Sequence, residues 1–249
     1  MKFGAIIIGD EILSGKRQDK HLAKTIATLA ERGMELSWAQ YLGDDSELIV
    51  ATLRRTFGGS DVVFSFGGIG ATPDDHTRQS AARAADVALL LHPDAEAEIR
   101  GRFVDDPKGV TPQRLMMGEF PEGSVIIPNP YNRIPGFSFR NHYFLPGFPE
   151  MAWPMLAWVL NTHYADAGAV LPVEAAIIVR EAGESQLIEL MNECVRAYPQ
   201  LKVFSLPRVT PERFIELGVR GNAAQVAEAI AMLQAGVSGL GFPWVPALT

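Results

Sequence analysis

Acidic side chains and glycines follow the apolar segments of this chain at the points where each segment ends. Asp10 and Glu11 come directly after one apolar run, Asp44 and Asp45 after a second segment, and the glycine loop Gly67–Thr77 after a third. Glycine N–H groups can face a ligand because no Cβ stands in the way, and a following helix favours negative charge at its N-terminus. Carboxylates are ligands that Mg²⁺ and Mn²⁺ prefer. These residue types predict a site for a phosphorylated ligand with a divalent metal.

The glycine loop has the sequence Gly67-Gly68-Ile69-Gly70-Ala71-Thr72-Pro73-Asp74-Asp75-His76-Thr77. Its two adjacent carboxylates would repel a bare phosphate, so a bridging cation is the simplest way to accommodate both. The loop has neither the Gly-x-Gly-x-x-Gly spacing of dinucleotide loops nor the Gly-Lys-Ser/Thr of P-loops. A turn needed only for tight strand–helix packing is the alternative, and the Thr-Pro-Asp-Asp-x-Thr continuation favours the functional interpretation.

The acids differ in how strongly they indicate function. Glu11, Asp44 and Asp75 are the candidates for catalysis and metal binding, because nothing local requires a carboxylate at these positions. For Asp45 and Asp74, capping of the following helix is at least as good an explanation. A Gly-x-Ser-x-Gly nucleophile motif does not occur. A water activated by the metal is therefore the expected nucleophile of any hydrolysis.

Several other residues are expected to contact the ligand at the same edge of the sheet. Backbone N–H groups of the glycines would hold phosphate, and Thr77 would donate its hydroxyl to phosphate or cap the next helix. The Pro146–Pro149 segment either forms a rigid loop at this edge or is a plain turn. Lys16, Arg17 and Lys20 either meet phosphate across the cleft or are solvated. The expected ligand contacts are Gly67, Gly68, Gly70, Thr77, Asp10, Pro146 and Gly147.

Composition limits the functional classes. The 249 residues carry a formal net charge of −7 with 47% hydrophobic residues, which fits a globular protein and argues against nucleic-acid binding. The single cysteine, Cys194, excludes an intramolecular disulfide and is expected in the core. We see neither a signal-peptide pattern nor an apolar run of membrane-spanning length. These features predict a cytoplasmic protein without a membrane partner.

The elements that position these residues alternate along the chain. Apolar runs predict strands at Phe3–Ile8, Met34–Leu42 and Asp61–Phe66, separated by helices at 20–32 and 47–57, with Ser46 as the N-cap of the second. This order predicts parallel strands with right-handed crossovers, whose carboxyl ends share one edge. The remaining expected elements of this part are a helix from Thr77, a helix within 93–111 with a loop at 104–110, a strand at 124–127, a hairpin at 137–145 and a helix at 150–164.

A domain boundary is expected near Asp166-Ala167-Gly168, which divides the chain into domains 1–167 and 168–249. Beyond it the pattern restarts in a β-α-β-β-α order that fits a small ferredoxin-like α+β unit. Its expected elements are strands at 173–179, 201–206 and 214–219 and helices at 184–197 and 223–234.

Several motifs together resemble a known family. The glycine loop resembles the Gly-Gly-x-Gly…Asp-x-Thr signature of the molybdopterin-binding (MoaB/MogA-like, MoCF) family, and most closely the branch at the N-terminus of the competence/damage-inducible protein CinA. Ile8–Gly15 resembles the opening motif of that branch. Asn129-Pro130 with Pro135-Gly136-Phe137, and Leu145–Met151, resemble its later motifs, and Gly183-Glu184-Ser185 and Leu217–Gly221 resemble its small second domain.

The resemblance implies a three-layer α/β/α domain with a mostly parallel sheet, a small α+β domain and a homo-oligomer, dimer or trimer. It implies binding of a pterin or nucleotide pyrophosphate. In the CinA-like branch, the domain is associated with hydrolysis of ADP-ribose-like pyrophosphates that depends on Mg²⁺, Mn²⁺ or Co²⁺. Glu11, Asp44 and Asp75 match the acids of that site. Because the chain ends at Thr249, we expect no amidase domain.

Three functions follow as hypotheses. The first is a metal-dependent pyrophosphatase, and the second is a molybdopterin-binding protein without hydrolytic activity. The third is a structural or regulatory oligomer that has lost its site. Departures from the family pattern bear on the choice: Ile69 replaces a common threonine, the Arg17–Lys20 stretch replaces Asn-Thr-Asn, and Leu115–Met117 is less polar than is usual.

Overall fold

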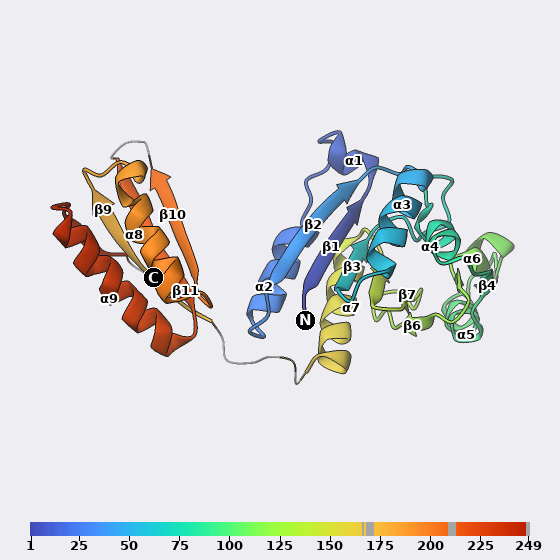
Figure 1. Ribbon diagram of the computed structural model, residues 1–249. Helices are drawn as coiled ribbons and strands as arrows, with labels where there is room; N and C mark the ends of the chain where they lie inside the picture. The colour runs from blue at the N-terminus through green and yellow to red at the C-terminus, as the bar shows by residue number, and fades with distance from the viewer. Residues whose placement is uncertain (166, 168–171, 209–212, 248–249) are drawn as a thin grey trace. The chain divides into compact units, whose positions relative to one another are not determined.

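The computed structural model describes residues 1–165, 167, 172–208 and 213–247, in two units, Met1–Gly168 and Ala169–Thr249 (Figure 1). We call them unit 1 and unit 2. The boundary predicted at Asp166-Ala167-Gly168 includes positions that lie outside the described residues.

Unit 1 is built on a six-stranded sheet in the order β2-β1-β3-β8-β7-β6. Strands β2, β1, β3 and β8 run parallel to one another, while β7 and β6 are antiparallel additions at one side. The predicted mostly parallel sheet is thus confirmed. Its strands are β1 (Phe3–Ile8), β2 (Leu36–Leu42), β3 (Val62–Phe66), β6 (Val125–Ile127), β7 (Gly136–Phe139) and β8 (His142–Leu145).

The register of the parallel strands brings three loops to one edge. Ile8 at the end of β1 pairs with Leu42 at the end of β2, and Ile7 pairs with Phe66 at the end of β3. The segments that follow these strands therefore leave the sheet side by side. This is the edge at which open α/β sheets bind ligands.

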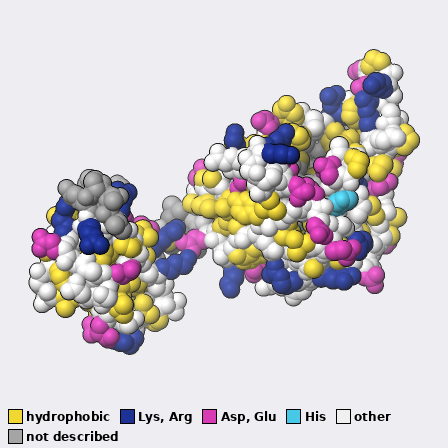
Figure 2. All heavy atoms as spheres, turned by 90° about the horizontal axis from the view of Figure 1, so that it is seen from above, with side chains coloured by type: hydrophobic (Ala, Val, Ile, Leu, Met, Phe, Trp, Pro, Cys, Tyr) yellow, Lys and Arg dark blue, Asp and Glu magenta, His cyan; other side chains and the backbone are white. Residues whose placement is uncertain are grey.

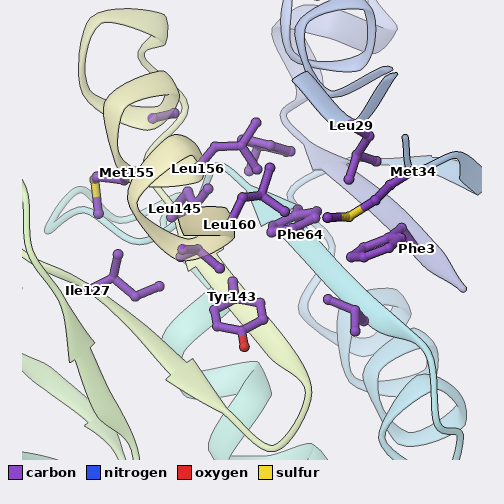
Figure 3. Packing of buried hydrophobic residues seen from close by; sticks show 14 of the residues in the cluster. Phe3, Leu29, Met34, Phe64, Ile127, Tyr143, Leu145, Met155, Leu156 and Leu160 are labelled. Atoms are coloured by element: carbon purple, nitrogen blue, oxygen red, sulfur yellow. The ribbon is translucent and has the colours of Figure 1, made fainter. Parts of the chain in front are cut away.

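Helices cover both faces of the sheet and form two cores. Ile7 and Phe64 face a cluster with α2 and α7, whereas Ile6 and Val63 face a cluster with α3 and α4. In Figure 3, Leu156 and Leu160 of α7 lie beside Phe64 of β3. The helices of unit 1 are α1 (Asp10–Leu13), α2 (His21–Ala30), α3 (Ser46–Phe57), α4 (Thr77–Ala85), α5 (Pro93–Arg102), α6 (Pro112–Met116) and α7 (Pro149–His163).

Burial on both faces explains why the strands have continuous apolar sequences. All six residues of β1 and all five of β3 are buried. Each fully buried Leu, Ile or Phe side chain contributes roughly 1.5–3 kcal/mol relative to exposure. The two cores therefore stabilise the sheet whose edge carries the three loops. The predicted three-layer arrangement is confirmed.

Local details differ from the sequence predictions. The N-cap of α3 is Asp45 rather than Ser46, because the Asp45 carboxylate accepts the N–H groups of Glu47 and Leu48. The short helices α1 and α6 were not expected. Neither was the two-stranded pair of β4 (Leu89–Leu91) and β5 (Glu119–Pro121). Each is five residues or fewer, too short to show a periodicity in sequence.

Unit 2 has a four-stranded antiparallel sheet in the order β10-β11-β9-β12, which is the ferredoxin-like order. A short last strand, which the sequence did not reveal, pairs with β9 and completes the sheet. Cys194 is buried in the core between sheet and helices, as predicted. The elements are β9 (Val173–Arg180), α8 (Glu184–Ala197), β10 (Lys202–Arg208), β11 (Phe214–Gly221), α9 (Ala223–Gly239) and β12 (Trp244–Pro246).

Within the described parts of the chain, every helix is too short or too polar to cross a membrane.

Candidate functional site

The glycine loop connects β3 to α4 and has a backbone that only glycine fits. Gly67 and Gly68 have φ values of +101° and +68°. A Cβ on Gly67 would lie 2.3 Å from the Ile8 carbonyl oxygen, and one on Gly68 would lie 2.2 Å from Thr77 Oγ1. The Gly67 N–H donates to the Leu145 carbonyl at 3.0 Å, which anchors the loop on β8. The loop therefore approaches its neighbours more closely than any side chain allows.

Thr77 supports the loop from within. Its side chain is fully buried, and its hydroxyl donates to the Gly67 carbonyl at 3.0 Å. Its backbone N–H donates to the Gly68 carbonyl at 2.9 Å. The residue before α4, His76, caps the helix with no side-chain hydrogen bond. The predicted roles of Thr77, a hydroxyl on phosphate or a helix cap, are thus replaced by a bond that shapes the loop.

A cleft of about 380 Å³ lies along the loop at the carboxyl ends of the strands. This volume is within the roughly 300–1,000 Å³ typical of small-molecule sites. Thr77 and Asp10 are not among its lining residues. The predicted site residues that do line it are Glu11, Asp44, Gly67, Gly68, Gly70, Asp75, Pro146 and Gly147.

Asp75 is held by its own loop. Its Oδ2 accepts hydrogen bonds from the Thr72 N–H at 2.9 Å and from the Thr72 hydroxyl at 2.5 Å. A Cβ on Gly70 would lie 2.5 Å from the same oxygen. One carboxylate oxygen thus orders the turn, and the other is left for a ligand or cation.

Asp10 and Asp44, of which only Asp44 lines the cleft, are joined by two hydrogen bonds. The Asp10 N–H donates to Asp44 Oδ2, and the Asp10 carboxylate accepts the Asp44 N–H. Burial raises the pKa of the Asp44 carboxyl, while the hydrogen bond from the Asp10 backbone lowers it. The negative charges of Asp10, Glu11 and Asp74 raise this pKa further. In Figure 2, which views unit 1 from the side of α1, several Asp and Glu side chains gather on this face.

The donor set accommodates a divalent cation only with help from a ligand. Across the part of the chain that the structure describes, His, Cys, Asp and Glu side chains form no group of three or more that could hold a metal. Mg²⁺ usually keeps several waters and binds through one or two carboxylates together with substrate phosphates. Glu11, Asp44 and Asp75 line the same cleft as the glycine loop and fit that mode. Metal binding by these three residues remains a prediction.

Part of the cleft lining is apolar. Asn132 donates through Nδ2 to Met151 Sδ at 3.1 Å and accepts the Ile134 N–H at 2.9 Å. Asn129 donates to the Ile134 carbonyl at 2.9 Å, which fixes the same turn. The apolar lining residues are Met117, Ile134, Pro135, Phe148 and Met151. We call these residues the apolar lining.

Most of the apolar lining could not be identified from the sequence. The motifs at Asn129-Pro130 and Pro135-Gly136-Phe137 indicated the segment but not its place in the cleft. Met117 and Met151 gave no signal at all, because a methionine at helical spacing is usually a core residue.

The departures from the family pattern have structural roles. Ile69 is 8% exposed and belongs to a hydrophobic core, so it forms an apolar wall of the cleft. Asp19 accepts the N–H groups of His21 at 2.8 Å and Leu22 at 3.1 Å and so starts α2. Arg17 is exposed and lines the cleft, and its contact with phosphate stays a prediction.

Comparisons with known proteins agree with this geometry. A model of the family described as "Probable molybdopterin binding domain" matches residues 4–165. A CinA-like protein of Syntrophotalea carbinolica is 31% identical over 72% of this chain and 44% of its own length. A CinA-like protein of Desulfosudis oleivorans is 29% identical over 90% of this chain and 55% of its own. The chain thus spans about half the length of these curated relatives.

One solved structure is also similar. The crystal structure of the protein CinA with unknown function from Thermoplasma acidophilum superposes with a TM-score of 0.58 at 29% identity. The match covers 65% of this chain and 98% of that chain.

Proposed function

The chain belongs to the family of probable molybdopterin binding domains, and we propose that its cleft binds a phosphorylated pterin such as molybdopterin. The observation that carries this proposal is the mixed lining of the cleft, which combines the glycine loop with apolar side chains. The glycine loop and the apolar lining belong to the same cleft, so that a ligand with a phosphate and a flat ring finds a partner for each.

The glycine loop would bind the phosphate through hydrogen bonds, and the apolar lining would contact the ring. Backbone N–H groups of Gly68 and Gly70, together with the N-terminus of α4, favour a phosphate. Met117, Ile134 and Met151 offer polarisable and apolar contacts to a ring, and methionines adapt well to such shapes. Arg17 adds a cation at the rim.

The proposal is tested by titrating the purified protein with molybdopterin and following binding by fluorescence or calorimetry. Saturable binding at one site per chain is expected. Failure of molybdopterin to bind, with nucleotides binding instead, would contradict the pterin assignment.

A second candidate function is the metal-dependent hydrolysis of nucleotide pyrophosphates such as ADP-ribose. It is favoured by the presence of three carboxylates, Glu11, Asp44 and Asp75, in the same cleft as the glycine loop. These residues would hold Mg²⁺, Mn²⁺ or Co²⁺ together with the phosphates. The bound metal would lower the pKa of a coordinated water. Water would then add to one phosphorus as the bridging P–O bond breaks, giving AMP and ribose phosphate.

The second function is tested by incubating the protein with ADP-ribose, with and without each metal, and measuring AMP. Metal-dependent release of AMP supports it. Absence of cleavage with every metal leaves pterin binding as the function of the site. For either function we also propose a homo-oligomer, a dimer or trimer, which light scattering would test.

A further inference from the structure

Arg78, the second residue of α4, is a fully buried cation directly behind the glycine loop. Its Nη2 donates to the Gly70 carbonyl at 2.7 Å, and its Nη1 donates to the Glu119 carbonyl at 3.2 Å and to the Met116 carbonyl. Its Nε has no hydrogen-bond partner among the described residues. The hydrogen bonds of the guanidinium thus go to backbone carbonyls alone, and the Nε–H and one Nη2–H make none among the described residues.

The charge of Arg78 also lacks a direct counter-ion. Within the described residues, Arg78 forms no ion pair with a carboxylate. Burial lowers the pKa of its guanidinium, while the more distant charges of Glu119 and Asp75 raise it. An arginine remains protonated in proteins, and a buried charge is normally paired. The interior of unit 1 therefore contains a positive charge that has no carboxylate in direct contact among the described residues.

The location of this charge connects it with the cleft. Gly70, whose carbonyl accepts from Arg78, lines the cleft on its other side. Met117 lies next to Met116, a second acceptor, and lines the cleft as well. Arg78 thus connects the glycine loop with the segment that carries Met117, and Arg78 itself is not a lining residue of the cleft.

We propose that Arg78 is a positioning residue whose buried charge gives the glycine loop its preference for a phosphate anion. The inference rests on the proposed phosphate-binding role of the loop and does not depend on which ring the ligand carries. A phosphate on the loop supplies the counter-charge that the protein interior lacks. In a poorly screened interior, such an interaction acts over several ångströms, so direct contact is not required.

Inorganic pyrophosphate is the probe, titrated calorimetrically with and without Mg²⁺ into wild type, Arg78→Met and Arg78→Gln. Both variants remove the charge, and the glutamine keeps a donor toward Gly70. We expect pyrophosphate to bind about 30-fold more weakly to both variants. This is the effect expected when a charge a few ångströms behind the loop is removed from a region of intermediate dielectric constant. Arg78→Lys, which keeps the charge, should stay within about threefold of wild type on the same reasoning. The matched control is Arg83→Met, because Arg83 lies on the same helix but is exposed and paired with Glu47.

A phosphate-free pterin distinguishes this role from simple support of the fold. The affinity of the phosphate-free pterin should be the same for Arg78→Gln as for wild type. The loss of pyrophosphate affinity in Arg78→Gln should be smaller at high salt. The inference is overturned if folded Arg78→Gln binds pyrophosphate like wild type, if Arg78→Lys loses as much as Arg78→Gln, or if wild type binds no pyrophosphate. Wild type that binds pyrophosphate but no pterin would refute the proposed ligand and leave the role of Arg78 standing.

Discussion

Asp10 and Asp44 exchange two hydrogen bonds across the ligand edge of the sheet. The Asp10 N–H donates to Asp44 Oδ2 at 2.9 Å, and the Asp44 N–H donates to Asp10 Oδ1 at 3.2 Å. The pair joins the loop after β1 to the loop after β2, so two carboxylates are held close together in spite of their like charges. A bound cation would relieve the repulsion between these like charges.

We predict that Asp44→Asn stabilises the free protein at neutral pH. Asparagine can still accept the Asp10 N–H but carries no charge. Because burial raises the pKa of Asp44 in the folded chain, its contribution to stability is present below the ordinary value of 3.8 and lost as pH rises through the folded pKa. The free energy of unfolding at pH 7 should therefore rise by about 0.5 kcal/mol, the scale of partly exposed charge pairs.

Urea denaturation of Asp44→Asn at pH 7 and pH 4 checks this. The gain should shrink at pH 4, where the wild-type carboxyl takes up a proton. Asp105→Asn, which removes an exposed charge elsewhere in unit 1, serves as control. An equal gain at both pH values, or a loss at pH 7, would refute the explanation.

Gly68→Ala should distort the loop. Alanine at the positive φ of Gly68 costs about 1 kcal/mol, and its Cβ would also lie 2.2 Å from Thr77 Oγ1. Gly109→Ala is the matched control, because Gly109 has a φ of +58° and open space around the position of a Cβ. Thermal denaturation should show a larger loss for Gly68→Ala than for Gly109→Ala. Equal losses would mean that contact with Thr77 is unimportant.

His142 should make the protein sensitive to acid. Burial, with the nearby charge of Arg140, lowers the pKa of His142 from 6.5 to about 3. A lowered pKa contributes stability above the unfolded value, and this contribution is lost as pH falls toward the folded value. The free energy of unfolding should fall by up to about 1.4 kcal/mol per pH unit between pH 6 and pH 4 from this group. In His142→Gln the slope should decrease by that amount, and an unchanged slope would assign acid sensitivity to other groups.

Asp75→Asn tests the second candidate function. If Asp75 helps to hold a metal, its variant should lose metal-dependent release of AMP from ADP-ribose, while its melting temperature stays close to wild type. Asparagine can still accept from Thr72, so the turn should persist. Asp105→Asn is again the control and should keep full activity. Undiminished turnover in Asp75→Asn would exclude that residue from the metal site.

The sequence was sufficient for the fold of unit 1 because its evidence is continuous along the chain. The buried strands β1 and β3 have apolar residues on both faces, and the helices between them have clear periodicity. The family resemblance, carried by the glycine loop and the later motifs, is confirmed by the family model over residues 4–165. The strand β12 was missed because three residues, one of them proline, carry no period.

The site was predictable where residues directly follow the carboxyl ends of the parallel strands, as the glycines of the loop and the three candidate carboxylates do. Gly67, Gly68 and Gly70 line the cleft because strand and helix force them there. Side-chain direction was not predictable: the pattern Asp-x-Thr does not indicate that Thr77 faces inward. Neither did the sequence indicate that Arg78 is buried, because an arginine on a helix is usually exposed.

The most direct test of the central claim compares a pterin with its monophosphate on wild type and Gly68→Ala by calorimetry. We expect wild type to bind the monophosphate more tightly than the unphosphorylated pterin, and we expect Gly68→Ala, but not Gly109→Ala, to abolish the difference. Equal affinity of wild type for both pterins, or a phosphate preference retained in Gly68→Ala, would contradict a phosphate-binding role of the glycine loop.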